Sequence, residues 1–513
     1  MKVKMHTSLN FAIFLVVLHH AYSEDHLGAL GPNNGVNFRL NEKGLRYVAD
    51  KAMEGYYEYI TKKALFPKAW ASRTLFVKNQ ELVEMCKPTF NISFEKYGHN
   101  RWTKEFSADV TDFKCDKIKF VGDYEVWENS KAVPSKAGTF SITVTRIKNR
   151  HAAFGVELRE KEELQSTLRV FVRGHYKPKG TIDLEITGND DNVTLRESIR
   201  KTLMEEAQDL IEDLFDVSFS IFDRVVYGRI EDVISNRTDY IEVQDPRLRV
   251  FYWILQAPNF TETSVDTLFW GETTWKRYLS KAPKGNLTWP HVPEAETKMV
   301  TIQLTDYIMN SIGYLMYNDN ALSFNITREQ IPPSARDMLS FSDCTNCAGD
   351  MFPWRKEKNA GGSMEVRIKA SSPPRLVLET DDQPVVSFKG HFEGYVAMPG
   401  ERWPQQILTV DAKLSLPLEL SVVDNNIVGK ILVNETKFVK VDREYPAPSV
   451  DVNMEIFQEL VKVGFIGPLN GIFQKGFPLP MYNGISCVNP EVFVKSNLIM
   501  VSTDLAIDPE LLQ

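Results

Sequence analysis

The residues of this chain that could do chemistry are few and lie far apart in the sequence. There is no Gly-x-Ser-x-Gly segment, which carries the nucleophile of an α/β-hydrolase, and no His-Glu-x-x-His, P-loop or dinucleotide-binding motif. An isolated histidine is far more often a surface or hydrogen-bonded residue than a catalytic one, and six isolated histidines follow the N-terminal leader: His26, His99, His151, His175, His291 and His391. The sequence predicts a protein that is not an enzyme and uses no metal or cofactor.

The five cysteines are better explained by disulfides than by a metal site. Cys344 and Cys347 have the spacing of half a zinc site, but no second ligand pair accompanies them, which favours a local disulfide. Cys86 and Cys115 lie in one neighbourhood of the sequence and could staple a hairpin or loop. This interpretation leaves Cys487 as the unpaired thiol.

The N-terminus predicts export from the cell. Residues 1–23 resemble a secretory signal, with Lys2 and Lys4 before an apolar run and a small-residue cleavage site at 21–23. No later apolar run is long enough to cross a bilayer. Seven N-x-S/T sequons support a secreted, extracellular glycoprotein: Asn91, Asn192, Asn236, Asn259, Asn286, Asn325 and Asn434.

The charge balance argues against a nucleic-acid partner. Formal net charge is −8, and loss of Lys2 and Lys4 makes the mature chain more acidic. Residues 51–150 nevertheless hold 18 Lys and Arg against 12 Asp and Glu. This excess could meet anionic headgroups, although a solvated mixed surface explains it equally well.

Two stretches have the period of amphipathic helices. The longer one, 194–222, begins with a capping box of Thr194 and Glu197 and has an acidic outer face. Its apolar residues recur mostly three or four apart: Leu195, Ile199, Leu203, Ala207, Leu210, Ile211, Leu214, Ile221 and Phe222. The shorter one follows Asn41 and ends before Pro67. Both helices need an equally long apolar partner.

Between and beyond these helices the sequence alternates as antiparallel strands do. Residues 72–188 predict a meander with one apolar face, which the two helices would cover. The same order restarts with a helix at Thr305 and Asp306, alternating strands between 364 and 433, a late helix at about 452–473 and a last strand at 492–501. The sequence therefore predicts an α+β fold of two tandem elongated units, with the boundary at about 250–275.

Five short segments, in order, resemble the family of bactericidal/permeability-increasing protein, lipopolysaccharide-binding protein and the plasma lipid transfer proteins. Each segment is weak alone, but together they cover the mature chain. They are Asn34-Gly35-Val36 with Arg39, Lys43-Gly44-Leu45 and Tyr47; Leu255-Gln256-Ala257-Pro258 with Thr261-Glu262-Thr263; Asp306-Tyr307 with Asn310 and Gly313-Tyr314-Leu315; Ser371-Ser372-Pro373-Pro374-Arg375-Leu376; and Gln474-Lys475-Gly476-Phe477-Pro478-Leu479-Pro480.

The resemblance implies a boomerang of two barrels, each a twisted antiparallel sheet wrapped around long helices, joined by a central sheet. Its domains would be a signal peptide (1–23), an N-terminal lipid-binding barrel (24–255), a linker and central sheet (256–275) and a C-terminal barrel (276–513). Two departures stand out. The 194–222 helix lacks the cysteine that usually ties it to its sheet, and the chain lacks a strongly cationic tip.

The resemblance also implies a monomer that carries or transfers phospholipid or another lipid. The expected lipid-lining residues lie on the helix stripes, where a plain protein core is the competing interpretation: Leu45, Val48, Ala49, Ala52, Met53, Ile308, Ile312, Leu315, Met316, Phe457, Leu460 and Val461. Two alternatives remain open. One is innate-immune binding of lipopolysaccharide or an anionic membrane surface through Lys114, Lys117, Lys119, Lys148 and Arg150. The other is a receptor ligand or scaffold that keeps the fold and has lost the pocket.

Overall fold

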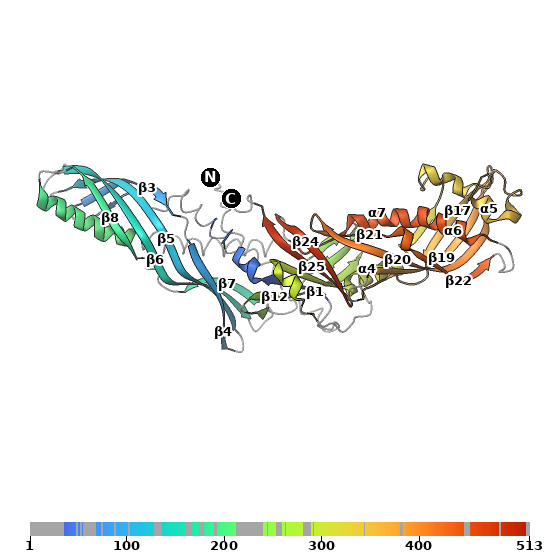
Figure 1. The fold of residues 1–513 in the computed structure, drawn as a ribbon, viewed down its shortest axis with the longest axis horizontal. Helices are drawn as coiled ribbons and strands as arrows, with labels where there is room; N and C mark the ends of the chain where they lie inside the picture. The colour runs from blue at the N-terminus through green and yellow to red at the C-terminus, as the bar shows by residue number, and fades with distance from the viewer. Residues whose placement is uncertain are drawn as a thin grey trace.

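The computed structural model describes most of the chain. The described residues are 35–47, 50–51, 54, 68–72, 75–86, 89–100, 103–127, 136–160, 166–173, 179–188, 192–211, 240–243, 245–252, 259–261, 263–276, 278–280, 289–290, 292–342, 344–379, 383–445, 452–481 and 484–508. The signal peptide and the 212–222 end of the long helix lie outside them. The chain is elongated, with a sheet and helix at one end, a sheet in the middle and a second sheet-and-helix lobe at the other end (Figure 1).

The N-terminal lobe is the antiparallel meander that the alternating sequence predicts. Its order is β2-β3-β5-β6-β7, with β4 on β5 and β8 on β6. The strands are β2 (Trp70–Ala71), β3 (Leu75–Met85), β4 (Thr89–Asn100), β5 (Thr103–Val126), β6 (Lys136–Glu160), β7 (Ser166–Arg173) and β8 (Lys179–Thr187). Two alternating runs, from Phe140 and from Phe154, belong to the single strand β6, whose pairing with β5 continues through both runs.

The long helix covers this sheet with its apolar stripe. Helical residues run from 193 to 211, and Ile199, Leu203 and Ala207 are buried in one cluster with Phe120 and Phe140 of the strands. The predicted capping box is wrong. The helix starts at residue 193, because the Asn192 Oδ1 accepts the Leu195 amide at 3.0 Å and takes the capping role from Thr194.

A six-stranded sheet in the middle joins distant parts of the chain. Its order is β11-β12-β1-β15-β25-β24, formed by β11 (Asn259–Phe260), β12 (Ser264–Trp270), β1 (Gly35–Asn41), β15 (Val300–Thr305), β25 (Leu498–Ile507) and β24 (Ile485–Lys495). The predicted single strand 492–501 is wrong. It is two strands of a hairpin, because Asn497 adopts a φ of 60° in the turn that follows Lys495.

Both faces of this central sheet are buried, but they differ in chemistry. Val36, Phe38 and Leu40 of β1 lie on the apolar face, in register with Leu304, Ile302 and Val300 of β15. Asn37 and Arg39 lie on the opposite, polar face. There Thr301 and Ser502 both donate to the Ala295 carbonyl, so the 3₁₀ turn η2 (Pro293–Thr297) covers the sheet through hydrogen bonds.

A smaller sheet and one helix join the apolar face of the central sheet in a shared core. The order of the smaller sheet is β14-β13-β10-β9, and helix α4 (Asp306–Asn318) contacts β13. The four strands are β9 (Tyr240–Val243), β10 (Asp245–Phe251), β13 (Glu272–Trp275) and β14 (Tyr278–Leu279). Val250, Trp275 and Ile308 are buried in this core, called the junction core below, together with Val36 and Phe38.

The C-terminal lobe repeats the arrangement of a curled sheet against a long helix. Its strands are β16 (Ser323–Ile326), β17 (Ser363–Ala370), β18 (Arg375–Val377), β19 (Val385–Ala397), β20 (Gln405–Val423), β21 (Asn426–Ile431), β22 (Lys437–Tyr445) and β23 (Phe477–Pro478). Helices α6 (Met454–Val461) and α7 (Gly467–Lys475) are joined by the π-helical turn η6 (Lys462–Ile466). Gly464 lies in this turn because a Cβ there would be 2.5 Å from Ile326 of β16.

One turn residue connects this lobe to the central sheet. Asn425 lies in the β20–β21 turn with a φ of 59°. Its Oδ1 accepts the Cys487 amide at 2.8 Å and its Nδ2 donates to the Ile485 carbonyl at 2.7 Å. The neighbouring turn residue Asp424 also has a positive φ, of 48°.

Asn425→Ala should lower the free energy of unfolding more than Asp424→Ala does. Both alanines would bear a left-handed backbone, at about 1–2 kcal/mol, but only Asn425→Ala removes the two hydrogen bonds to β24. We expect an additional loss of about 1–3 kcal/mol for the two bonds, measured by urea titration. Equal losses for the two variants would mean that the bonds to β24 contribute nothing.

Candidate functional site

The apolar residues expected to line lipid separate into two groups in the structure. Leu45, Ile308 and Leu315 are buried in the junction core, and Ile312 and Met316 pack against it partly exposed. Phe457, Leu460 and Val461 are buried in the core of the C-terminal lobe. Of the stripe predicted for the first helix, the structure therefore places Leu45 in the same core as α4. Val48, Ala49, Ala52 and Met53 lie outside the described residues.

Close backbone contacts set the position of Leu45. A Cβ at Gly44 would lie 2.5 Å from the Met299 carbonyl oxygen, and a Cβ at Gly35 would lie 1.7 Å from the Phe269 carbonyl oxygen. Both glycines allow the first strand and helix to press against the central sheet. The helix that follows β1 therefore turns Leu45 into the junction core, where it is 2% exposed.

Helix α4 is held against β18 by the residues that carried the family resemblance. Asn310 donates to the Leu376 carbonyl at 3.3 Å and accepts the Leu376 amide at 2.7 Å. Gly313 leaves room for Pro374, whose carbonyl oxygen would be 2.9 Å from an added Cβ. These contacts turn Ile308 and Leu315 towards the junction core.

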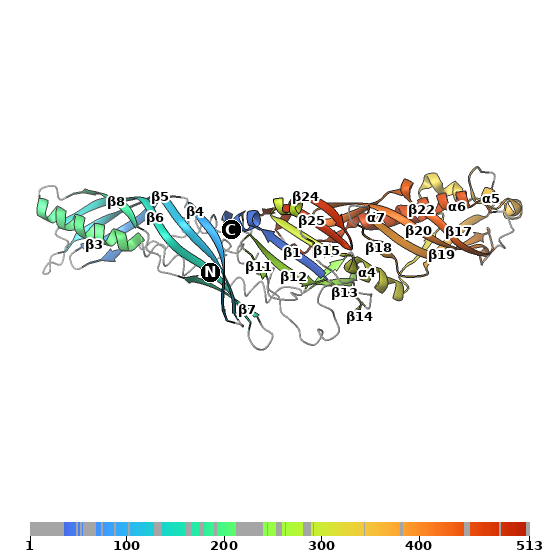
Figure 2. The same cartoon turned by 60° about the horizontal axis from the view of Figure 1, so that its bottom comes forward.

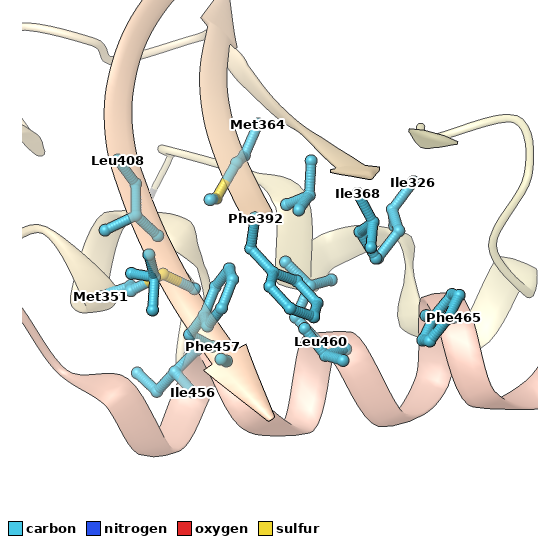
Figure 3. Close-up of a cluster of buried hydrophobic side chains, with 14 of the residues drawn as sticks. Ile326, Met351, Met364, Ile368, Phe392, Leu408, Ile456, Phe457, Leu460 and Phe465 are labelled. Carbon is cyan, nitrogen blue, oxygen red and sulfur yellow. The ribbon is translucent and has the colours of Figure 1, made fainter. Parts of the chain in front are cut away.

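The second group forms an aromatic core. Phe457 and Leu460 of α6 point towards Phe392 and Met364 of the strands (Figure 3). Phe457 meets Phe392 and Phe438 edge to face, with ring centroids 6.1 and 6.0 Å apart. Because these side chains are closed over by protein, a lipid would reach Phe457 only if its neighbours moved.

A polar groove borders the first helix, whose described residues are 42–47, 50–51 and 54. It encloses about 760 Å³ and is lined by Arg39, Asn41, Glu42, Lys43, Arg46, Thr261, Thr263, Ser264 and Glu296. Arg39 pairs with Asp266 at 2.6 Å and with Glu296, and Lys43 pairs with Asp504 at 2.7 Å. The hydrogen bond to Asp266 raises the pKa of the Arg39 guanidinium. The groove is therefore charged, but carboxylates of the protein neutralise Arg39 and Lys43.

A row of three lysines crosses the N-terminal sheet. Lys114 of β5 lies opposite Lys148 of β6, and Lys148 lies opposite Lys179 of β8; all three are exposed. Directly opposed like charges destabilise a sheet unless an anion compensates them, and no described carboxylate pairs with these three. Sequence reasoning named Lys114 and Lys148 but missed Lys179, because only the register places it beside them.

The other expected basic residues are less available to an anion. Lys117 pairs with Glu84 at 2.6 Å. Lys119 is half-buried and lies opposite Thr143, and the side chain of Arg150 lies outside the described residues. The row Lys114–Lys148–Lys179 is therefore the part of this basic surface that could accept an anion.

Two disulfides and an unpaired thiol account for the cysteines. Cys86, just after β3, joins Cys115 of β5 with Cα atoms 5.5 Å apart, and Cys344 joins Cys347 with Cα atoms 5.9 Å apart. Cys487 is free, and burial raises the pKa of its thiol. Within the described ranges there is no cluster of three or more His, Cys, Asp or Glu suited to a metal ion.

Three of the sequons are visible at the surface. Asn192, Asn325 and Asn434 are exposed, whereas the side chains of Asn91, Asn236, Asn259 and Asn286 lie outside the described residues.

The helices of the described part of the chain include none with the length and apolar character needed to cross a membrane.

Phe457→Ala should lower the free energy of unfolding by about 3–5 kcal/mol, because it opens a cavity in a closed aromatic core. The change can be measured by urea titration beside Val441→Ala, a truncation at a 67% exposed position of the same lobe, which should cost less than about 1 kcal/mol. A small loss at Phe457, with more lipid bound, would instead make Phe457 a lining residue of a filled pocket.

Comparison with known proteins places these features in a family. The C-terminal domain model of the LBP / BPI / CETP family matches residues 243–507. Bactericidal permeability-increasing protein of Sebastes schlegelii is 22% identical over 280 residues, 53% of this chain and 55% of that protein. BPI fold-containing family C protein of Mus musculus is 22% identical over 222 residues, 42% of each chain. The matched segment thus spans about half the length of these two relatives.

Other comparisons extend over nearly the whole chain. Human lipopolysaccharide-binding protein is 21% identical over 509 residues, 88% of this chain and 89% of that protein. A crystal structure of lipopolysaccharide-binding protein superposes with a TM-score of 0.52 at 16% identity, covering 93% of this chain and 99% of that one. The likeness at this identity concerns the fold. The chain belongs to the LBP / BPI / CETP family.

Proposed function

We propose that this protein is a secreted lipid-binding protein, not an enzyme, that carries or transfers phospholipid or another lipid. Membership in the LBP / BPI / CETP family is the observation that carries the proposal. The domain division at 24–255, 256–275 and 276–513 belongs to the same proposal, with each lobe an elongated barrel in a boomerang-shaped monomer.

The most suitable place for an acyl chain is beside the first helix. Leu45 enters the junction core beside α4, and the next apolar positions of the stripe predicted from the sequence are Val48, Ala49, Ala52 and Met53. Alanines at two of these positions would leave space that larger side chains fill elsewhere. Ile312 and Met316 of α4 are only partly buried and could border the same space.

Removal of acyl chains from water would supply the binding energy. Each buried CH₂ contributes about 0.8 kcal/mol, so one long chain outweighs any single polar contact to its headgroup. The specificity for a lipid class would then come from the polar rim. The charged groove around Arg39 and Lys43 is our candidate for that rim, because Arg46, the residue after Leu45, also lines it.

The purified secreted protein should contain about one or two lipids per chain, and Ala52→Trp should reduce that occupancy. The indole would occupy the space that an acyl chain needs. Mass spectrometry of lipids extracted after detergent-free purification measures both results. Asp50→Trp is the matched control, because Asp50 is an exposed helical residue two positions before Ala52 in the sequence.

Secretion of both variants at wild-type levels would show that they fold. Equal lipid content in folded Ala52→Trp and Asp50→Trp proteins would remove Ala52 from the pocket. A wild-type chain that emerges empty, and stays empty after incubation with vesicles, would contradict lipid carriage. The chain would then be a recognition protein or scaffold on the same fold.

A second candidate function is recognition of anionic lipid, including lipopolysaccharide. The row Lys114–Lys148–Lys179 favours it, because three opposed cations without described carboxylate partners form a surface that phosphate groups would stabilise. The acidic charge of the whole chain opposes such attraction away from local basic surfaces. Such binding would weaken as salt screens the lysines.

Replacing all three lysines of the row by glutamine should weaken binding to anionic vesicles about 100-fold, since each lysine near such a surface contributes about 1 kcal/mol. Vesicle sedimentation at low and high salt measures the change. The control replaces three exposed lysines of the other lobe, Lys369, Lys389 and Lys440. Equal weakening in both triple variants would indicate general charge attraction rather than a site.

A further inference from the structure

Two loops meet at the outer end of the C-terminal lobe. One contains the 3₁₀ turn η4 (Pro353–Arg355) and directly follows helix α5 (Ala348–Met351), which lies at the extremity of the molecule in both views (Figures 1 and 2). The other, residues 398–404, connects β19 to β20. Arg355 Nη1 donates to Gln405 Oε1 at 3.1 Å, so the first loop is fixed to the start of β20.

The two loops also come close to each other at a second point. A Cβ at Gly362 would lie 2.7 Å from the sulfur of Met398. The first loop therefore comes close to the second at both of its ends, and the side chains that the two loops expose belong to one surface. We call residues 353–362 and 398–404 the distal surface.

This distal surface exposes two tryptophans. Trp354 is 44% exposed and Trp403 is 75% exposed. Each ring carries the guanidinium of a neighbouring arginine, with Arg355 4.7 Å from the Trp354 centroid and Arg402 5.4 Å from the Trp403 centroid. Indoles have an apolar body and a polar N–H, and they concentrate where a membrane meets water.

Arg355 brings a positive charge to the distal surface. Its side chain is nearly buried, at 8% exposure, and its Nε has no hydrogen-bond partner. No described carboxylate forms an ion pair with it. A buried guanidinium without a counter-charge is costly, so an anionic surface close to this end of the lobe would stabilise it.

The remaining charges of the distal surface are also mainly positive. Lys358 and Arg402 add cations, Lys356 is neutralised by Asp350 at 2.8 Å, and Glu357 and Glu401 are the acids. Two indoles and an excess of cations at one extremity match the chemistry of a phospholipid surface, which offers an apolar boundary beneath a layer of phosphates.

We propose that the distal surface docks on a phospholipid membrane, with Trp354 and Trp403 seated among the headgroups and the exposed cations Lys358 and Arg402 beside the lipid phosphates. This docking does not depend on lipid being carried inside the protein. It places the end of the elongated molecule, rather than its flank, against the lipid surface. The lysine row of the other lobe, Lys114–Lys148–Lys179, remains outside this contact.

The test is sedimentation with vesicles of phosphatidylcholine and phosphatidylserine. Replacing Trp354 and Trp403 by serine should weaken binding about 10-fold for each indole removed. The matched control is Val439→Ser with Val441→Ser, two exposed apolar residues of the same lobe, on β22. Its binding should remain at the wild-type level.

Two further measurements keep the result interpretable. Trp403→Ser alone tests the same idea if the double variant is unstable, because a 75% exposed side chain supports little of the core. Vesicles with brominated acyl chains should quench wild-type tryptophan fluorescence more than that of Trp403→Ser. At high salt this quenching should fall less than binding through the lysine row does, because the indoles add apolar contact that salt does not screen.

Unchanged vesicle binding by Trp403→Ser, or an equal loss in the β22 control, would overturn the proposal. So would a wild-type protein that does not bind these vesicles at all, which would direct attention to a protein partner for the two tryptophans. Lipid extracted from the tryptophan variants should equal that of the wild type. The docking surface and the carried lipid are therefore tested by separate readouts.

Discussion

The pairing of β1 with two distant strands is the constraint on which the rest of the structure depends. Seven residues near the start of the chain insert between β12 and β15, and Arg39 of β1 faces Asp266 of β12 across the sheet. The apolar face of β1 builds the junction core, and its polar face carries the charged groove. Leu45 follows directly, so the same pairing also positions the first helix.

The two lobes use similar architecture for different surfaces. In the N-terminal lobe, the outer face of the sheet carries opposed lysines, while its inner face packs on the 193–211 helix. In the C-terminal lobe, aromatic side chains close the space between helix and sheet. Its exposed chemistry is instead concentrated in two loops at the end. An elongated protein with a different surface on each lobe can meet two partners at once.

Local sequence pattern predicted much of the fold. Alternation located β1, β6 and β8, and the helical period located the 193–211 helix, because each element has one face that must be buried. Local pattern failed where two nearby groups compete for one role. Asn192 rather than Thr194 caps the helix, and Asn497 divides what looked like one strand into two.

The site was less predictable because it depends on register and on long-range packing. No local signal distinguishes Ile308, which enters the junction core, from Phe457, which enters a different core, since both lie on apolar helix stripes. Lys179 joins the lysine row only through strand pairing. Among the motif residues that revealed the family, Gly35 and Gly313 lie where backbones approach closely, and the Asn310 side chain hydrogen-bonds to the Leu376 backbone. These residues identify the fold but do not indicate which ligand is bound.

The position of β1 has a consequence for how the chain is made. Arg39 is synthesised 227 residues before its partner Asp266, which at ribosomal speed is an interval of about 10–50 s. During that time Val36, Phe38 and Leu40 have neither neighbouring strand. The N-terminal lobe, which lies between β1 and β12 in the sequence, can already fold. Contacts of such large sequence separation form slowly. The centre of the molecule is therefore completed after its first lobe, and the earliest strand must be shielded from aggregation until the later strands emerge.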